Sequence, residues 1–456
     1  MKIIEKPSEY FLSVWPKQNF NGNTTYRPLK YIRNVTVKDG ILWFNMLSGE
    51  IILFSNEEAE RYSKTSQISD QTAKELVEKW FLVPEDNNDS KLSKQLVSLF
   101  ESLNCISLSS KLSTFIILPT TDCNARCFYC YELGRSRKNM TLKTAEDVVS
   151  FIMKNKADGK IKFQWFGGEP LYNVQIIDYI SERLKENGVE FVSQMISNAY
   201  LFDDDMIFRA KKDWHLKQIQ ITIDGTEEIY NRTKAYIHKD CDNPFERVMA
   251  NVEKLLKNGI AVNIRLNMDM HNIDDVFALS DYLKEKFIKY DNMEIYPHLL
   301  YDYAQKFGNN RNEVYLKERF AKLQQMHKNT HKQEYKYFEM IRFKDHCMAD
   351  TDSSIVILPE GQLTKCEHDT DSNFIGTIYD DKIDHQKLIP YKKLGLPLGK
   401  CDECEMRPLC VRLEYCPNRR KFCDERDKES VKNAADNRIM LMYNYRLQHP
   451  IDSEEK

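Results

Sequence analysis

From about residue 113 onward, short apolar runs alternate with longer stretches whose apolar residues recur at helical spacing. The runs have the length and composition of buried strands and lie at residues 115–118, 161–166, 191–196, 219–223, 262–266 and 293–296. Helices are expected between them at residues 145–154, 176–185, 245–257 and 276–287. Because regular alternation of strands and helices forms a parallel sheet with right-handed crossovers, the pattern predicts an α/β domain. It leaves open whether the six units form an open sheet or a partial barrel.

The first hundred residues follow a different pattern, in which strand-like runs come first and helices follow. Three runs at residues 34–37, 41–44 and 51–54 are separated by glycine-containing turns, so we expect a small antiparallel meander. Ser55, followed three residues later by Glu58, predicts a capping box at the start of a helix. A second helix is expected over residues 73–80.

Length and charge narrow the class of protein. The chain has 456 residues, enough for about two to four domains, and its formal net charge of −3 is not that of a general nucleic-acid binder. No apolar run approaches the length of a membrane span, and the first residues lack the long apolar stretch of a secretory signal. We therefore expect a cytoplasmic protein that binds neither nucleic acid nor a membrane.

The placement of the cysteines changes this picture. The chain has 12 cysteines, which are not expected to form disulfides in a reducing compartment, and most of them are clustered as in metal sites. Cys123, Cys127 and Cys130 directly follow the first predicted strand of the α/β pattern. Three thiolates are one too few for a closed tetrahedral site but suit an iron–sulfur cube that keeps one iron free. The alternatives are a zinc site with a borrowed fourth ligand, or three small apolar residues on one helix face.

The later predicted strands are also followed by polar or glycine-rich residues. These are Gly167-Gly168-Glu169-Pro170, Ser197-Asn198, Thr222 with Asp224 and Gly225, and Arg265 with Asn267. In parallel sheets and barrels the active site forms at the carboxyl ends of the strands, so we expect these groups to meet there. Ordinary turn chemistry is the alternative, because Gly, Asn and Asp populate turns in any case.

The cysteine triplet with Tyr129, the Gly-Gly-Glu-Pro turn and the sequence Thr222-Ile223-Asp224-Gly225 together resemble a radical S-adenosylmethionine (SAM) enzyme, over about residues 113–300. The resemblance implies a partial (β/α)6 barrel. It also implies that Cys123, Cys127 and Cys130 hold a [4Fe–4S] cluster whose free iron chelates the amino and carboxylate groups of SAM. Such an enzyme cleaves SAM to a 5′-deoxyadenosyl radical, and its electrons come from a donor such as flavodoxin or ferredoxin.

The same resemblance implies a SAM-binding set at the strand ends. The set is Tyr129, Gly167, Gly168, Glu169, Pro170, Ser197, Asn198, Thr222 and Arg265. Glycines let the backbone approach a ligand closely, Glu169 would accept from the cationic amine, and Tyr129 would offer its ring or backbone to the adenine. Ser197, Asn198 and Thr222 would hydrogen-bond the ribose or carboxylate. Arg265, or else Arg232, would pair with the SAM carboxylate, although a strand-end or surface ion pair is the alternative for each.

Seven more cysteines lie in the last third of the chain: Cys347, Cys366, Cys401, Cys404, Cys410, Cys416 and Cys423. Their spacing, with Gly361 five residues before Cys366, resembles the SPASM extension of radical SAM enzymes that modify peptides and proteins. The resemblance implies one auxiliary cluster at Cys401, Cys404, Cys410 and Cys423, and a second at Cys347, Cys366 and Cys416. Five residues rather than three separate Cys410 from Cys416, so the assignment of Cys416 and Cys423 stays open. Zinc is the alternative metal, and His368 is either a further ligand or, as we prefer, a solvated or hydrogen-bonded histidine.

Residues 45–50 and 81–86 resemble parts of the winged-helix recognition domain of ribosomal-peptide maturases, which pairs a sheet edge with a leader peptide. A structural cap on the barrel is the alternative. We therefore expect a winged-helix-like peptide-recognition domain at residues 1–105, a radical SAM partial barrel at 106–335, and a SPASM domain with a C-terminal helix at 336–456.

The predicted function is modification of a ribosomally made precursor peptide that carries a leader. A thioether crosslink from cysteine is the favoured product, because an auxiliary cluster with an open site would suit a thiolate. No catalytic acid or base is identified. The alternatives are a maturase of a folded protein, such as the sulfatase-maturating type, and a non-catalytic zinc-binding interaction protein.

Overall fold

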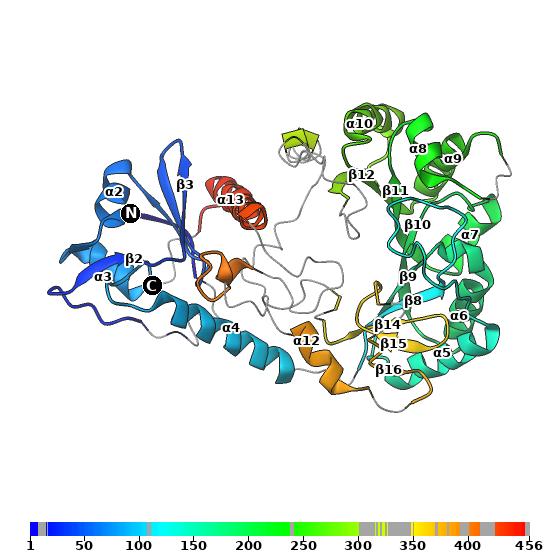
Figure 1. The fold of residues 1–456 in the computed structure, drawn as a ribbon, viewed down its shortest axis with the longest axis horizontal. Helices are drawn as coiled ribbons and strands as arrows, with labels where there is room; N and C mark the ends of the chain where they lie inside the picture. The colour runs from blue at the N-terminus through cyan, green and yellow to red at the C-terminus, as the bar shows by residue number, and fades with distance from the viewer. Residues whose placement is uncertain are drawn as a thin grey trace. The chain divides into compact units, whose positions relative to one another are not determined.

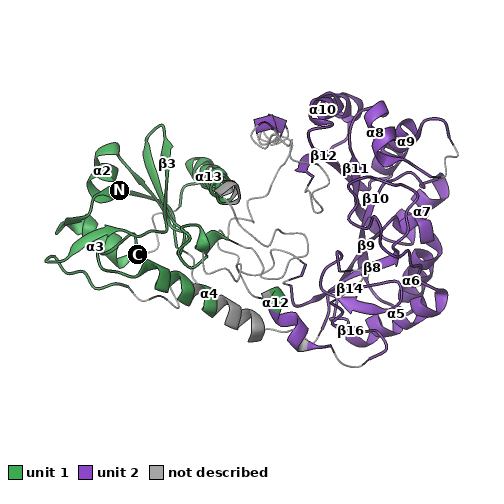
Figure 2. Ribbon diagram, viewed as in Figure 1, with its two compact units in different colours: residues 1–107, 334–346, 390–456 green, residues 108–333, 347–389 purple. Residues whose placement is uncertain are grey.

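The computed structural model describes residues 1–7, 15, 17–106, 111–237, 241–300, 315, 318–319, 322–323, 326, 348–349, 351–369, 373–380, 383–392, 401–410 and 425–451. They belong to two compact units (Figure 2). One unit comprises residues 1–107, 334–346 and 390–456, and the other comprises residues 108–333 and 347–389. The residues of the expected C-terminal domain are thus distributed over both units, and the three-domain division remains a prediction.

The larger unit is built on six parallel strands that lie side by side in the order of the sequence. These are β8 (Thr114–Thr120), β9 (Ile161–Gly167), β10 (Phe191–Ser197), β11 (Leu216–Ile223), β12 (Ala261–Met268) and β13 (Met293–Leu299). The order never reverses, so right-handed crossovers place every connecting helix on the same face, as in a barrel wall. Because β13 does not pair with β8 among the described residues, this sheet is open.

Figure 1 shows the helices of this unit along one side of the strands. They are α5 (Leu142–Asn155), η1 (Pro170–Asn173), α6 (Val174–Glu186), α7 (Asp204–Lys212), α8 (Glu227–Lys234), α9 (Pro244–Lys257) and α10 (Ile273–Phe287). The six predicted strands and the four predicted helices are confirmed, and the α/β class with them. The apolar pattern did not predict α7 and α8, since α8 buries only Tyr230 and Lys234.

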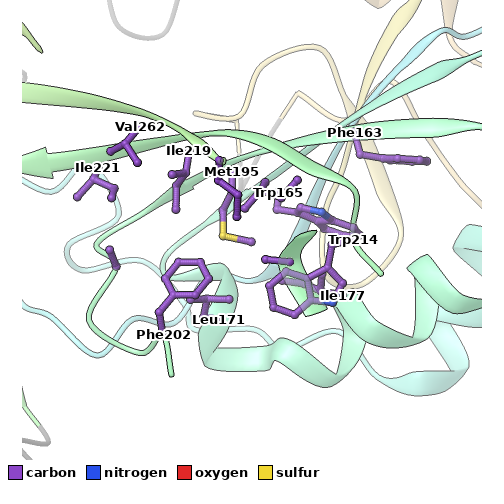
Figure 3. Packing of buried hydrophobic residues seen from close by; sticks show 14 of the residues in the cluster. Phe163, Trp165, Leu171, Ile177, Met195, Phe202, Trp214, Ile219, Ile221 and Val262 are labelled. Atoms are coloured by element: carbon purple, nitrogen blue, oxygen red, sulfur yellow. The ribbon is translucent and has the colours of Figure 1, made fainter. Parts of the chain in front are cut away.

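Alternation of side chains along the strands gives the sheet two different faces. On the face toward the helices, Trp165, Met195 and Ile219 pack with Leu171 and Ile177 (Figure 3). A smaller apolar cluster occupies the other face and consists of Ile116, Leu118, Phe166, Val356 and Leu358. Both clusters are buried, so β8 and β9 are covered on two sides.

A segment far along the chain extends this sheet. Strand β14 (Ser354–Ile357) pairs in parallel with β8, and β15 (Gln362–Thr364) and β16 (Gly376–Thr377) follow in antiparallel pairing. Gly361 has a φ of +86° in the tight turn between β14 and β15, a conformation that glycine adopts without strain. The glycine ahead of Cys366 is therefore a turn residue.

The smaller unit contains the predicted meander. Strands β3 (Ile32–Val37), β4 (Gly40–Asn45) and β5 (Ile51–Phe54) are antiparallel neighbours, and β1 (Lys2–Glu5) pairs with β5. A second sheet has the order β6-β2-β7, formed by Ser66–Gln67, Thr25–Pro28 and Leu82–Pro84. The predicted capping box of Ser55 and Glu58 begins α2 (Asn56–Ser63), and α3 (Gln71–Glu78) matches the second predicted helix. The long helix α4 (Asp89–Ile106) was not predicted.

Buried polar contacts join the first stretch that suggested a winged helix, residues 45–50, to the residues just before the second one. The Asn45 amide donates to the carbonyl of Trp80 at 3.0 Å, and Lys79 Nζ lies 2.6 Å from the buried carboxylate of Glu50. Burial raises the pKa of Glu50 despite the opposing effect of Lys79. The loop after β4 is thus fastened to the end of α3.

The remaining helices are η3 (His385–Leu388), α12 (Ile389–Lys392), η4 (Arg407–Leu409) and α13 (Glu425–Gln448). Helix α13 is tied to the N-terminal strands, because Arg33 pairs with Asp436 and Arg446 with Glu5, each at 2.7 Å. The C-terminal helix therefore completes the unit that the N-terminus begins. Among the described helices, none combines the length and apolar character needed to cross a membrane.

We predict that Lys365→Met loosens β14 and β15. The buried Lys365 ammonium donates to the carbonyls of Thr351 and Ser354 at 2.6 and 2.7 Å, and its loss leaves buried acceptors unsatisfied, at about 1–3 kcal/mol. Hydrogen exchange of the β14 and β15 amides should become faster while α5 keeps its protection. Lys387→Met, at an exposed lysine that donates to the carbonyl of Phe374, is the matched control. Equal exchange in both variants would contradict the prediction.

Candidate functional site

Cys123, Cys127 and Cys130 lie on an irregular loop that starts where β8 ends. All three are half-buried free thiols, and the Cys130 N–H donates to the Cys127 carbonyl at 3.1 Å. The alternative of three cysteines on one helix face is therefore wrong. The turn that this hydrogen bond closes brings the three thiols near enough to affect one another's pKa values.

The three thiols affect one another electrostatically. Burial raises the pKa of Cys123 and raises that of Cys127 to about 11, and further increases come from neighbouring thiolates. Burial also raises the pKa of Cys130. A cationic metal centre would offset this mutual repulsion, since metal binding requires deprotonated thiols and stabilises them.

The loop and the end of β10 each supply a hydrogen-bond donor to the sulfur of Cys123. The Ala125 N–H lies 3.3 Å from Cys123 Sγ, and the Asn198 amide lies 3.8 Å from the same atom. Hydrogen bonds to ligand sulfurs are a feature of iron–sulfur sites. Within the described ranges, no three His, Cys, Asp or Glu side chains come close enough to hold a single metal ion. A [4Fe–4S] cluster would take each thiolate on a different iron, so the three thiols need not converge on one point. The residues present therefore fit a cluster.

Gly167 and Gly168 pack against the start of the cysteine loop. A Cβ at Gly167 would overlap the Thr120 carbonyl oxygen, and one at Gly168 would overlap that of Asp122. Gly167 also has a φ of +125°, which only glycine adopts readily. We expected these glycines to admit a ligand; in the structure they admit the backbone that leads into the cysteines. Their contact with SAM remains a prediction.

Glu169 is fully buried and connects two strand ends. Its carboxylate accepts from the Ser197 hydroxyl at 2.8 Å, the Asn198 N–H at 2.7 Å and the Leu171 N–H at 3.2 Å. Burial raises the pKa of Glu169 to about 7, although these hydrogen bonds lower it. Pro170, which is also buried, starts η1 directly after it. Glu169 is predicted to accept from the amine of SAM. In the structure it also holds the ends of β9 and β10 together, a role that sequence reasoning missed.

Tyr129 belongs to a buried polar group. Its hydroxyl donates to Asp224 at 2.8 Å and accepts from Lys234 Nζ at 3.2 Å, while Lys234 pairs with Asp224 at 3.0 Å. Asp224 ends β11, as predicted, but Lys234 was missed. A single lysine at the end of a short polar helix carries no signal in the sequence, because its burial is decided by neighbours that are distant along the chain.

Thr222 and Arg265 are register partners on β11 and β12 and are both half-buried. The Nε of Arg265 is buried and has no hydrogen-bond partner among the residues that the structure describes, whereas Arg232 is exposed on α8. Of the two candidate arginines, Arg265 is therefore better placed to meet a ligand carboxylate. Asn267, two residues further along β12, is buried.

Two histidines that sequence reasoning did not assign to the site lie near Arg265. Burial, followed by the charge of Arg265, lowers the pKa of His298 to about 4. Burial, together with the charges of Arg135 and Arg265, also lowers the pKa of His368 to about 4. The His368 ring contacts Tyr131 with centroids 4.0 Å apart, and its carbonyl accepts from Arg135 at 2.8 Å. Both imidazoles are thus neutral at pH 7.

The cysteines of the last third divide between the two units. Cys366 is buried after β15 in the larger unit, and Cys401, Cys404 and Cys410 lie in the smaller one, on consecutive turns that flank η4. Cys347, Cys416 and Cys423 lie outside the described residues. The ligand sets of the auxiliary clusters therefore remain predictions.

Gly168→Ala should prevent correct formation of the cysteine loop, because the new methyl group overlaps the Asp122 carbonyl. We expect reconstituted protein to hold well under half of the iron of the unchanged chain. Gly22→Ala is the matched control, since Gly22 does not have a left-handed φ and a Cβ there makes only ordinary van der Waals contacts, at 3.7 and 3.9 Å. Iron and sulfide analysis measures both, and full loading of the Gly168 variant would contradict the prediction.

Glu169 should make stability depend on pH. Its pKa is raised above its ordinary value of 4.5 to about 7, so its stabilising contribution is complete below about pH 4.5 and is lost as pH rises through 7. The thermal midpoint of the unchanged chain should therefore fall relative to that of Glu169→Gln as pH rises from about 4.5 to 7, and the difference should level off above pH 7. Parallel midpoints across this range would count against the raised pKa.

Comparisons with known proteins agree with this geometry. A family model described as the radical SAM superfamily matches residues 117–283. An uncharacterized protein of Methanocaldococcus jannaschii is 32% identical over 116 residues, which are 25% of this chain and 38% of that protein. A probable GTP 3′,8-cyclase of Methanococcus maripaludis is 25% identical over 179 residues, or 38% of this chain and 56% of that protein. The chain thus spans about half, or less, of the length of these relatives.

Among solved structures, anSMEcpe with bound AdoMet and the Kp18Cys peptide shares the fold, with a TM-score of 0.55 and 19% identity over 73% of this chain and 99% of that chain. The same protein with AdoMet alone has a TM-score of 0.54. The family match includes all three cysteines of the loop, Glu169 and Asp224. The chain therefore carries a radical SAM domain, which works with a [4Fe–4S] cluster and SAM.

Proposed function

We propose that this radical SAM enzyme modifies a ribosomally made precursor peptide. The observation that carries the proposal is the likeness of the larger part of the chain to anSMEcpe, a protein whose structure holds AdoMet together with a peptide. The smaller unit adds a sheet of a kind that can bind an extended peptide. The radical SAM domain favours this function over that of a non-catalytic zinc-binding interaction protein.

The strand ends of the larger unit would hold the cofactors. Cys123, Cys127 and Cys130 would bind the cluster, and Arg265 with Thr222 would face the SAM carboxylate from neighbouring strands. When bound, the cluster and SAM supply a 5′-deoxyadenosyl radical, which takes a hydrogen atom from the substrate. The protein's own contribution is to position the reacting groups and to exclude water around them.

The smaller unit would recognise the leader of the peptide. Its four-stranded sheet has the order β1-β5-β4-β3, so β3 pairs on one side only among the described residues. A peptide can add to such an edge through backbone hydrogen bonds and gain selectivity from side-chain pockets. The other edge of this sheet is β1, whose pairing with β5 is interrupted by a register shift between Ile3 and Glu5, so it offers a less regular edge than β3. We therefore assign leader binding to a winged-helix-like unit that offers β3 as the accepting edge.

The C-terminal cysteines would hold the auxiliary clusters. A cluster with an open coordination site could bind a substrate thiolate while a thioether forms, which is why we favour a cysteine-derived crosslink. Electrons would come from a small donor such as flavodoxin or ferredoxin. These assignments extend the proposal to Cys347, Cys366, Cys401, Cys404, Cys410, Cys416 and Cys423.

The decisive experiment uses the full chain, purified without oxygen, with candidate precursor peptides. The unchanged protein should contain iron and sulfide, cleave SAM under reduction, and give a peptide lighter by two hydrogens if a thioether forms. Cys123→Ala should reduce SAM cleavage at least a hundredfold, because one cluster ligand is lost. Protein that holds zinc without iron or sulfide, and leaves SAM intact, would overturn the proposal.

A second candidate follows from the curated relatives, since the barrel region resembles a probable GTP 3′,8-cyclase. The same assay with GTP in place of peptide separates the two: turnover of GTP, with no change to any peptide, would favour a small-molecule substrate. A maturase of a folded protein is distinguished by the leader. Supplying the leader as a separate peptide should compete with the precursor in a peptide maturase but leave a folded-protein maturase unaffected.

A further inference from the structure

A buried lysine lies at the end of α8, next to the cysteine loop. The Lys234 side chain is 3% exposed and its partner Asp224 only 1%, with 3.0 Å between Nζ and the carboxylate. Buried lysines are rare because the ammonium loses its hydration, and they persist when paired. Nothing in the proposed peptide chemistry requires this pair.

Lys234 is fastened to the loop that carries the cysteines. Its ammonium donates to the hydroxyl of Tyr129, the residue between Cys127 and Cys130 in the sequence, at 3.2 Å. Its backbone carbonyl accepts from the Arg126 N–H at 2.8 Å. A third contact follows nearby, where the Ile237 N–H donates to the Asn124 carbonyl at 2.9 Å. Residues 124–129 and 234–237 are thus held together at three points.

Asp224 keeps the ammonium in place from the other side. Its carboxylate accepts from the Tyr129 hydroxyl and forms an ion pair with Lys234, and its backbone carbonyl accepts from the Asn272 amide at 2.5 Å. Burial lowers the pKa of Lys234, but Asp224 and Tyr129 outweigh it and hold the pKa well above its ordinary value. The lysine therefore remains a fixed positive charge at neutral pH.

The pair is neutral as a whole, so its two charges have to be considered separately. Lys234 contacts the cysteine loop with its ammonium, at Tyr129, and with its backbone carbonyl, at Arg126. Asp224 meets the same loop with its carboxylate, at Tyr129. Loss of the lysine charge alone leaves a buried negative charge beside the loop, and loss of the aspartate charge alone leaves a positive one.

A fixed charge beside a cluster changes how readily the cluster accepts an electron. Reduction adds one negative charge, and a cation in a poorly hydrated environment stabilises that charge more than it would in water. Net charge and hydrogen bonding around the sulfurs are among the main determinants of cluster potential. Among the described residues, Lys234 is the fully buried cation that is tied directly to the cysteine loop.

We propose that Lys234 is a positioning residue that raises the reduction potential of the cluster held by Cys123, Cys127 and Cys130, with Asp224 holding its ammonium in place. The inference depends only on the cluster of the radical SAM domain and not on the identity of the substrate. It assigns a role to a residue that neither binds the cluster nor touches a substrate.

The test is a redox titration of the reconstituted full chain without SAM, in which the paramagnetic signal of the reduced cluster is measured. Lys234→Met should make the cluster harder to reduce, with up to about a tenfold smaller ratio of reduced to oxidised cluster at a given potential, or about 59 mV for one electron. Lys234→Arg keeps the charge and should stay close to the unchanged chain. Lys217→Met removes an exposed charge from the start of β11 and is the matched control.

Asp224→Asn separates electrostatics from loop structure. The asparagine oxygen can still accept from Tyr129, and the negative cluster site then serves as the counter-charge of Lys234, so the cluster should become easier to reduce. A merely structural pair would shift the potential in the same direction in both single variants. Shifts in the same direction, or no shift in variants with full iron and sulfide, would overturn the inference.

The double variant Lys234→Met with Asp224→Asn leaves no unpaired buried charge and therefore guards against poor folding of the single variants. Because the two substitutions change the local charge in opposite directions, the double variant should have a potential between those of the two single variants. A potential outside that interval would overturn the inference. If Lys234→Met does not take up iron, Lys234→Gln, which can still donate to Tyr129, replaces it, and a potential equal to that of the unchanged chain would then overturn the inference. Failure of the peptide assay leaves this result untouched, since the titration contains no substrate.

Discussion

The pairing of Thr120 with Gly167, where β8 and β9 both end, is the constraint on which the site depends. The register shifts just before this pair, and Gly167 and the next residue, Gly168, lie against the backbone that leads into the cysteine loop. The Glu169 N–H then donates to the Asp122 carbonyl at 2.9 Å. Three consecutive backbone contacts thus set where the loop leaves the sheet, and they set the position of the first cysteine with it.

Parallel order extends this local constraint to the whole site. Since every strand runs in the same direction and lies beside its predecessor, the carboxyl ends of β8 to β12 meet along one edge. Buried carboxylates at these ends then find partners from other ends: Glu169 pairs with Ser197, and Asp224 with Tyr129. Thr226, just after β11, donates to Asp275 on α10 at 2.6 Å. Such a network is stable only when every member is satisfied, so it holds the strand ends in one arrangement before any ligand binds.

The C-terminal part of the chain completes both units. Strand β14 lengthens the parallel sheet beside β8, and α13 is tied to β1 and β3 of the N-terminal sheet by ion pairs. The order of segments along the chain is therefore not the order of compact units. Removal of the first hundred residues would strip α13 of the strands it packs on, so a truncated chain does not isolate the contribution of leader binding.

The strands and main helices of the larger unit were predictable, because runs such as residues 161–166 and 219–223 combine length, apolar character and regular spacing. The short polar helix α8 and the long helix α4 were not, since their formation depends on contacts with distant segments. At the site, the sequence identified the cysteines, the glycine turn and Asp224 by their positions after strands. It did not reveal that Glu169 braces two strand ends, or that Gly167 and Gly168 make room for backbone.

The residues that could carry the chemistry can be read from the sequence, because the number and spacing of thiols and the periodicity of apolar residues are properties of the chain alone. Which charges are buried, and which partners they meet, depends on the fold. Lys234 and Arg232 are two residues apart on one helix, yet one is paired beneath the cysteine loop and the other is exposed. Burial depends on segments that are distant in sequence, and no local pattern encodes it.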